Sequence, residues 1–283
     1  MKKQFLIPVL IISVLAGCST LRDLSDIQEP TVSYRDVNIQ SISFDGITLL
    51  FDFDVTNPNR FGVTAEEYRY EFFINNRSFL SGEQPEQVSI GREESTIIQV
   101  PVSLNFSEIA QTFGSVVRGD SISYQLSTEV EFDLPVAGRQ RVPVEAGGQF
   151  PLPKIPRIEF GGFDVRQMSF TGAEIEVSIR VTNPNSFGIS LSGADYQLEI
   201  NGNEWLDTFL DQSVDVDGSE SKTVVIPISL NASQLGSAMR EIVMGNRDLQ
   251  YHFTGEAEIS ADIEGFEGVQ YIPFDLSGNY RLD

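Results

Sequence analysis

Hydrophobic and polar residues alternate along most of the chain, which is the pattern of β-strands with one buried face. In residues 47–55 and 175–181 the apolar side chains fall on every second position, with mostly polar residues between them. Further alternating runs cover 68–74, 98–104 and 124–132. The pattern predicts an all-β protein of antiparallel strands.

Turn and edge signals divide these runs. Asn75-Asn76 and Asn201-Gly202 follow strand patterns, and Asn-Gly is a strong signal for a two-residue hairpin. Pro101 and Pro227 lie inside apolar runs, and a proline has no N–H for a sheet ladder. We therefore expect those two strands to lie at sheet edges or to carry bulges.

One segment in each half of the chain has helical spacing instead. Its apolar residues recur at i, i+4, i+7 and i+8: Ile109, Phe113, Val116 and Val117 in the first half, and Leu235, Met239, Ile242 and Val243 in the second. Asn105 and Asn231 stand where N-caps belong, with Glu108 and Gln234 three residues later. Gly119 and Gly245 are the expected left-handed stops.

The two halves are copies of one another. Residues near 37–120 recur at an offset of 126 near 163–246, including Asn57-Pro58-Asn59, which matches Asn183-Pro184-Asn185. We therefore predict two tandem domains, at 35–150 and 157–283, joined by a proline-rich linker at 151–156. Six or seven antiparallel strands and one short α-helix per domain favour two tandem β-sandwiches.

The lone cysteine closes an export signal. Lys2 and Lys3 precede an apolar run at 5–15 that ends in Ala16-Gly17-Cys18, and the run is too short to span a bilayer. The sequence resembles bacterial lipoprotein signals, which implies cleavage of residues 1–17 as a signal peptide and acylation of Cys18. The alternatives are a short membrane anchor or a buried cysteine.

A lipidated Cys18 makes the membrane the expected partner, with residues 18–34 as a tether. Ser19 follows the cysteine where an Asp usually retains a lipoprotein at the inner membrane. For a host with two membranes, the expected location is therefore the outer membrane, facing the periplasm.

The net charge and the small number of Cys and His residues exclude several classes of partner and of metal or cofactor site. The chain carries 41 Asp and Glu against 19 Lys and Arg, a formal charge of −22, so nucleic acid is a poor partner. Loss of residues 1–17 removes Lys2 and Lys3 and brings the charge to −24. With one Cys and one His, the sequence offers no Cys/His zinc site, iron–sulfur cluster or disulfide framework. We expect no cofactor.

Candidate catalytic and metal-binding residues are few. His252 is expected on an outward strand face and has no second His or nucleophile elbow to complete a triad. The acids at 52, 54, 174 and 176 are expected on outer strand faces, which argues against paired-carboxylate glycosidase chemistry. A glycine turn with acidic neighbours resembles a calcium loop without EF-hand spacing: Asp211, Asp215, Asp217, Gly218 and Glu220. We favour a plain turn there and expect no metal.

Two glycine pairs remain, Gly147-Gly148 and Gly161-Gly162. Neither opens a helix, so the pairs are interpreted as turns rather than phosphate cradles.

The Asn-Pro-Asn tripeptide after a strand, followed by a hairpin, a proline-containing strand and a helix, resembles the late embryogenesis abundant type 2 family. Its domain is also called the water stress and hypersensitive response (WHy) domain. The resemblance covers both copies and implies an immunoglobulin-like or fibronectin-III-like sandwich with one helix. Asn57, Pro58, Asn59, Asn183, Pro184 and Asn185 carry this family motif, and we interpret them as turn-forming residues, since Asn caps turn backbone and Pro holds its predecessor extended.

The resemblance implies a non-enzymatic envelope protein with a role in tolerance of desiccation or osmotic stress. An alternative is a module that binds or transfers a lipid or other apolar ligand in the sandwich interior. A further alternative is a scaffold or adhesion domain pair. The second copy has the smaller apolar side chains in its interior. Unfilled volume in that core is therefore the feature that would favour ligand binding.

Overall fold

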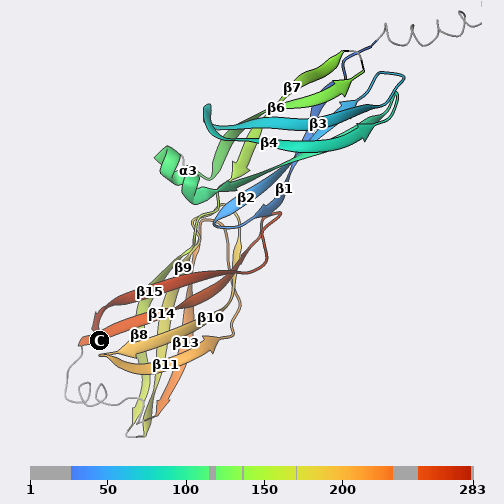
Figure 1. The fold of residues 1–283 in the computed structure, drawn as a ribbon. Coiled ribbons are helices and arrows are strands. Elements are labelled where there is room, and N and C mark those ends of the chain that lie inside the picture. Colours follow the sequence, from blue (N-terminus) through green and yellow to red (C-terminus); the bar gives the residue numbers. More distant parts are fainter. Residues whose placement is uncertain (1–26, 115–118, 136, 170, 232–247, 282–283) are drawn as a thin grey trace, which may run out of the picture. The chain divides into compact units, whose positions relative to one another are not determined.

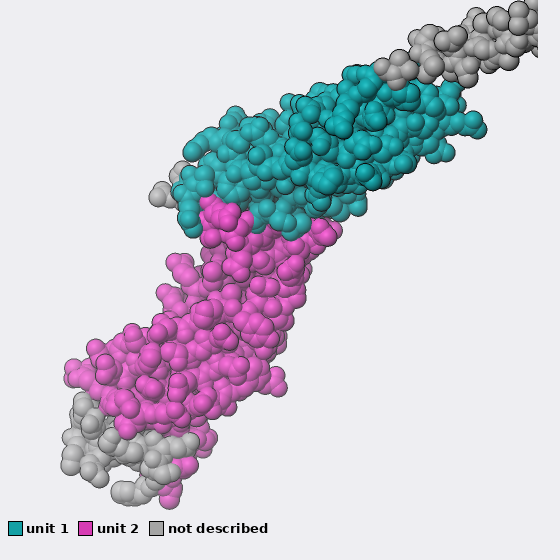
Figure 2. Space-filling view, viewed as in Figure 1, with its two compact units in different colours: residues 1–38, 48–104, 109–151 teal, residues 39–47, 105–108, 152–283 magenta. Residues whose placement is uncertain are grey.

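A computed structural model describes residues 27–114, 119–135, 137–169, 171–231 and 248–281. The chain forms two compact units, one of residues 1–38, 48–104 and 109–151 and the other of residues 39–47, 105–108 and 152–283 (Figure 2). Almost all of the described residues outside turns are in antiparallel strands (Figure 1). The predicted all-β class is confirmed.

The first domain is a sandwich of three strands on four. Its elements are β1 (Thr31–Ile42), β2 (Gly46–Thr56), β3 (Val63–Ile74), β4 (Arg77–Ile90), β5 (Ser95–Asn105), α3 (Phe106–Phe113), β6 (Ser121–Leu134) and β7 (Gly138–Pro151). One sheet has the order β1-β2-β5 and the other β4-β3-β6-β7. This three-plus-four arrangement is that of fibronectin type III domains.

The second domain repeats this arrangement. Its strands are β8 (Arg157–Ser169), β9 (Gly172–Thr182), β10 (Ile189–Ile200), β11 (Asn203–Leu210), β12 (Val214–Val216), β13 (Ser221–Asn231), β14 (Asp248–Ala261) and β15 (Gln270–Arg281). The sheets run β13-β9-β8 and β11-β10-β14-β15, and β12 pairs with β10. Where β4 is one strand of 14 residues, the second copy has β11 and β12 with a break between them.

The first core is made of the alternating residues seen in the sequence. Every second residue of β2 from Ile47 to Val55 is buried. Phe51 of one sheet contacts Phe72 and Tyr124 of the other, with ring centroids 6.5 and 5.6 Å apart. Each buried aromatic of this kind stabilises the fold by about 2 kcal/mol through area removed from water. The strand period therefore fixes which face of each sheet points inward.

The hairpin and edge predictions are confirmed. Asn75 and Asn76 have φ of 48° and 60°, and Asn201 and Gly202 have φ of 48° and 72°, the left-handed pair that a type I′ turn requires. Pro101 lies in β5 and Pro227 in β13, and each of these strands is at a sheet edge.

The helix of the first domain begins where predicted and ends earlier. Oδ1 of Asn105 accepts hydrogen bonds from the backbone N–H of Ser107 at 2.9 Å and of Glu108 at 3.2 Å, so Asn105 is the N-cap. The last residue of α3 is Phe113, and Gly114 follows with φ of 51°. The predicted stop at Gly119 is therefore wrong, because Gly114 already supplies the left-handed residue. The predicted second helix, with Asn231 as its cap and Gly245 as its stop, lies almost entirely outside the described residues.

The interpretation of the glycine pairs as turns is also wrong. Gly147-Gly148 lies within β7 and Gly161-Gly162 within β8. A Cβ on Gly148 would stand 2.8 Å from the Tyr124 hydroxyl, so this glycine makes room for an aromatic side chain on the next strand. Gly162 has φ of 141° and lies at a register shift between β8 and β9.

Candidate functional site

The Asn-Pro-Asn motifs are buried polar clusters at one end of each sandwich. Asn57 and Asn59 are 0% and 3% exposed, and Asn183 and Asn185 are 1% and 2% exposed. A buried amide costs stability unless its donors and acceptors are paired. The pairing of these side chains therefore shows what they hold in place.

Asn57 ties its own turn to the loop between β4 and β5. Its Nδ2 donates to the carbonyls of Phe61 at 2.7 Å and Gly91 at 2.9 Å. Its Oδ1 accepts from the backbone N–H and from Nδ2 of Asn59, both at 3.0 Å. The side chain is an Asx-type brace that uses both the donor and the acceptor of its amide.

Asn59 holds the segment that enters the domain. Its Oδ1 accepts from the backbone N–H of Gln28 at 2.8 Å, and its Nδ2 donates to the carbonyl of the same residue at 2.7 Å. Both backbone groups of Gln28 are satisfied by one side chain, as they would be by a neighbouring strand. We call this pair of contacts the entry clamp.

The second domain has the same clamp on the linker. Asn185 accepts from the backbone N–H of Lys154 at 2.7 Å and donates to its carbonyl at 2.8 Å. Asn183 donates to the carbonyls of Phe187, Val216 and Asp217. The segment at 151–156 therefore differs from a free extended spacer: Pro151 ends β7, and Lys154 is docked on the second domain.

The outer face of the four-stranded sheet in the first domain carries charge that is paired internally. Glu131 is 3% exposed, and its two carboxylate oxygens accept from Arg139 at 3.0 Å and Arg141 at 2.9 Å. Arg69 forms ion pairs with Glu67 and Glu83, both at 2.9 Å. These side chains make a cross-strand charge ladder that stabilises the sheet register.

Charges on the three-stranded sheets lie outward, as expected. Arg35 pairs with Asp54, and Arg166 pairs with Glu176. The hydrogen bond from Arg166 lowers the pKa of the Glu176 carboxyl, and the same contact raises the pKa of the Arg166 guanidinium.

His252 lies on an outer strand face, as its position in the alternating pattern predicts. Its side chain is 45% exposed, with Nε2 3.0 Å from Asp275 and Nδ1 3.7 Å from Glu199. Asp275 and Glu199 are cross-strand neighbours of His252 on an open sheet surface. Among the described residues, no serine, threonine or cysteine forms a hydrogen bond with the His252 ring.

The acidic turn of the second domain is part of the motif scaffold. The Asp217 carbonyl accepts from Asn183, and the Asp215 carboxylate accepts from Ser190 at 2.6 Å. A Cβ on Gly218 would stand 2.4 Å from the Ser186 carbonyl, which explains the glycine. Within the described residues, no group of three His, Cys, Asp or Glu side chains is placed to hold a metal ion.

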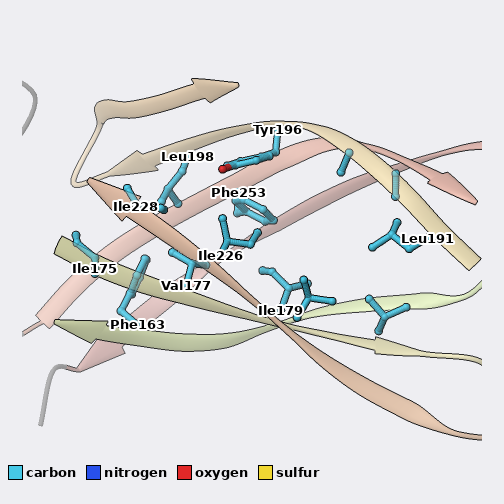
Figure 3. Packing of buried hydrophobic residues seen from close by; sticks show 14 of the residues in the cluster. Phe163, Ile175, Val177, Ile179, Leu191, Tyr196, Leu198, Ile226, Ile228 and Phe253 are labelled. Atoms are coloured by element: carbon cyan, nitrogen blue, oxygen red, sulfur yellow. The ribbon is translucent and has the colours of Figure 1, made fainter. Parts of the chain in front are cut away.

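In the described part of the chain, a small apolar cavity lies in the core of the second domain. Its volume is about 30 Å³, and its lining comes from both sheets, including Ile179, Tyr196, Ile226 and Phe253 (Figure 3). Ligand sites in proteins commonly measure about 300–1,000 Å³. The smaller side chains of copy two therefore leave slack of about one methyl group or one water.

Cys18 lies outside the described residues. No helix in the described part of the chain is long and apolar enough to cross a membrane.

The molecule is thus a tandem pair of fibronectin-III-like sandwiches, each braced by one Asn-Pro-Asn cluster. The sequence matches the Late embryogenesis abundant protein family (LEA_2) at residues 52–148 and again at residues 178–278. The chain belongs to this family, with two copies of its domain.

Known relatives have about the length of one copy. The chain is 27% identical over 130 residues to "Probable desiccation-related protein LEA14" of Arabidopsis thaliana. The aligned region covers 46% of this chain and 86% of that protein. It is 26% identical over 132 residues to "Desiccation protectant protein Lea14 homolog" of Glycine max, covering 47% and 87%. The solution structure of a putative late embryogenesis abundant protein, At2g46140.1, aligns with a TM-score of 0.40 at 26% identity, covering 52% of this chain and 86% of that one. The family match and the two desiccation-related proteins support a role related to desiccation stress.

Proposed function

We propose that this chain is a lipid-anchored envelope protein that protects its surroundings during water loss without catalysing a reaction. The anchor is the acylated Cys18, and the expected site is the periplasmic face of an outer membrane. The observation that carries the protective role is the family membership of both domains, together with relatives named for desiccation.

The surface supplies a physical means of protection. The mature chain has a net charge of −24, and the described Glu and Asp side chains lie mainly on outer strand faces. Carboxylates hold water and counter-ions, and a strongly charged surface keeps neighbouring macromolecules apart. Such a shell acts without a defined ligand, so the protein requires no cofactor.

The carrier alternative has weaker support. An acyl chain needs a cavity about ten times the 30 Å³ in the second core, unless the sheets separate. No observation in the described domains favours the scaffold or adhesion alternative over the protective role.

The anchor is tested with Cys18→Ser. We expect this variant to remain uncleaved or to leave the membrane fraction, because the acyl chains on that sulfur supply the membrane affinity. The measurement is fractionation of cells grown with labelled palmitate, with Ser19→Ala as the matched control. Label in the Cys18→Ser variant would refute the assignment.

A further inference from the structure

The entry clamp sets which end of the first domain faces the anchor. Gln28 is held by Asn59 beside the start of β3, and Thr64 at that start lies opposite Asp133 at the end of β6. The chain leaves the domain at Pro151, which lies opposite Ser121 at the start of β6. Entry and exit are therefore at opposite ends of strands about 40 Å long.

The clamp also shortens the tether. Gln28 is ten residues from Cys18, and ten extended residues span at most about 35 Å. Without the clamp, the chain would be held only from the buried Pro30 and the start of β1 at Thr31. The clamped end of the domain thus stays within one short tether of any lipid on Cys18.

The clamped ends of the two domains differ in where their basic residues lie. Arg60 and Arg92 are both exposed there, in the turn after β2 and in the loop between β4 and β5. At the offset of 126, the equivalent residues of the second domain are Ser186 and Gly218. Two arginines are thus present in these loops at the anchor end of the first domain, in a chain whose mature charge is −24, whereas the basic residues at the equivalent end of the second domain are Lys154 of the linker and Arg157 at the start of β8.

We infer that the clamped end of the first domain, at residues 57–62 and 91–94, lies against the bilayer that holds the anchor, with Arg60 and Arg92 on lipid phosphates. Guanidinium groups bind phosphate oxygens in a bidentate manner and gain affinity near an anionic membrane surface. The exposed Glu29, Glu93 and Glu94 lie at the same end and oppose the approach, so the inferred contact depends on both arginines. The inference rests on the proposed lipid anchor.

The test uses the full lipidated chain in vesicles of phosphatidylethanolamine and phosphatidylglycerol. With Cys18 acylated, a fluorophore is attached through Gly62→Cys, and in a matched variant through Gly188→Cys, the equivalent position of the second domain. A Cβ has ordinary contact distances at both sites, 3.5 Å to the Ile90 carbonyl and 3.9 Å to Asp262. Energy transfer to headgroup-labelled lipid is measured, and flotation of the vesicles reports the anchor separately.

We expect strong transfer from position 62 and weak transfer from position 188. Arg60→Ser with Arg92→Ser should reduce the membrane-contacting population about fivefold per arginine, since each basic residue adds about that factor at an anionic surface. Arg157→Ser with Arg180→Ser changes the net charge equally on the second domain and should leave transfer from position 62 unchanged.

Failure to float would refute the anchor and the inference together. Flotation with equal transfer from positions 62 and 188 would refute the orientation alone. Strong transfer from position 62 that the arginine substitutions do not alter would refute the phosphate contacts.

Discussion

Single asparagine side chains organise the ends of both sandwiches. Asn57 and Asn183 make the same set of contacts in domains whose cores differ in most side chains. An isolated turn would need only one or two of these hydrogen bonds. The retained pattern indicates that the motif joins the turn, the loop before the fifth strand and the entering segment into one unit.

The donor and acceptor directions of Asn57 give a sharp prediction. Asn57→Asp has nearly the same shape but replaces Nδ2 with an oxygen that faces the Phe61 and Gly91 carbonyls. We expect a loss of about 2–4 kcal/mol at neutral pH, because buried acceptors are left unpaired beside a buried charge. Urea denaturation measures it, with the exposed Asn38→Asp as control. A loss below about 0.5 kcal/mol would show that the amide is dispensable.

Buried tyrosines predict a limit to stability in alkali. Burial raises the pKa of Tyr68 from 10.0 to about 12, with smaller contributions from Glu86 and Tyr70. Burial also raises the pKa of Tyr124 from 10.0 to about 12, with a smaller contribution from Tyr34. A raised pKa means that folding favours the neutral phenol, so this stability is complete below pH 10 and is lost as the pH rises towards 12.

The tyrosine effect is measured by urea midpoints and tyrosinate absorbance across that range. In Tyr68→Phe the fall in stability with rising pH should be less steep. An unchanged slope would contradict the assignment to Tyr68, whose hydroxyl donates to Gln84 at 2.9 Å.

At the scale of elements, local periodicity is sufficient to predict the strands. It does not predict which distant segments pair with one another. The alternation in residues 47–55 and the Asn-Gly turn correctly predict β2 and a hairpin, because both signals are local. The prediction of turns at Gly147 and Gly161 is wrong because the role of these glycines depends on the neighbouring strand, which the sequence does not show. The contact of Asn59 with Gln28 was missed for the same reason.

A sequence signal for the clamp did exist. Gln28 and Lys154 are 126 residues apart, as are Pro30 and Pro156, and both prolines are buried. The repeat therefore extends further towards the N-terminus than the matching motifs from residue 37 onward indicate. Extending it would have marked both segments as parts of their domains.

The helix of the first domain depends on its cap. In Asn105→Ala the N–H groups of Ser107 and Glu108 lose their acceptor. We expect a loss of about 1 kcal/mol in the free energy of unfolding, measured by urea denaturation. Asn105→Ser should retain most of the stability, since serine is an equally good cap. Equal losses in both variants would show that the amide has another role.

At the scale of the whole molecule, the proposed function needs two acidic domains held at a membrane by the lipid on Cys18. The described residues of the second core enclose a cavity of about 30 Å³, which is too small for an acyl chain. In the proposed function, the surface acts through charge and hydration rather than through a ligand. The four-stranded sheet of the second domain presents such charge: Asp195 and Glu256 lie directly opposite one another, and neither has an ion-pair partner among the described residues.

The most direct test of this account is protection of a bystander enzyme through drying by the mature, unlipidated protein, residues 19–283. The account predicts more recovered activity than with an unrelated control protein of equal net charge, and no lipid copurifying in stoichiometric amount. Recovery equal to that control, together with about one lipid bound per domain by mass spectrometry, would contradict protection and establish the carrier instead.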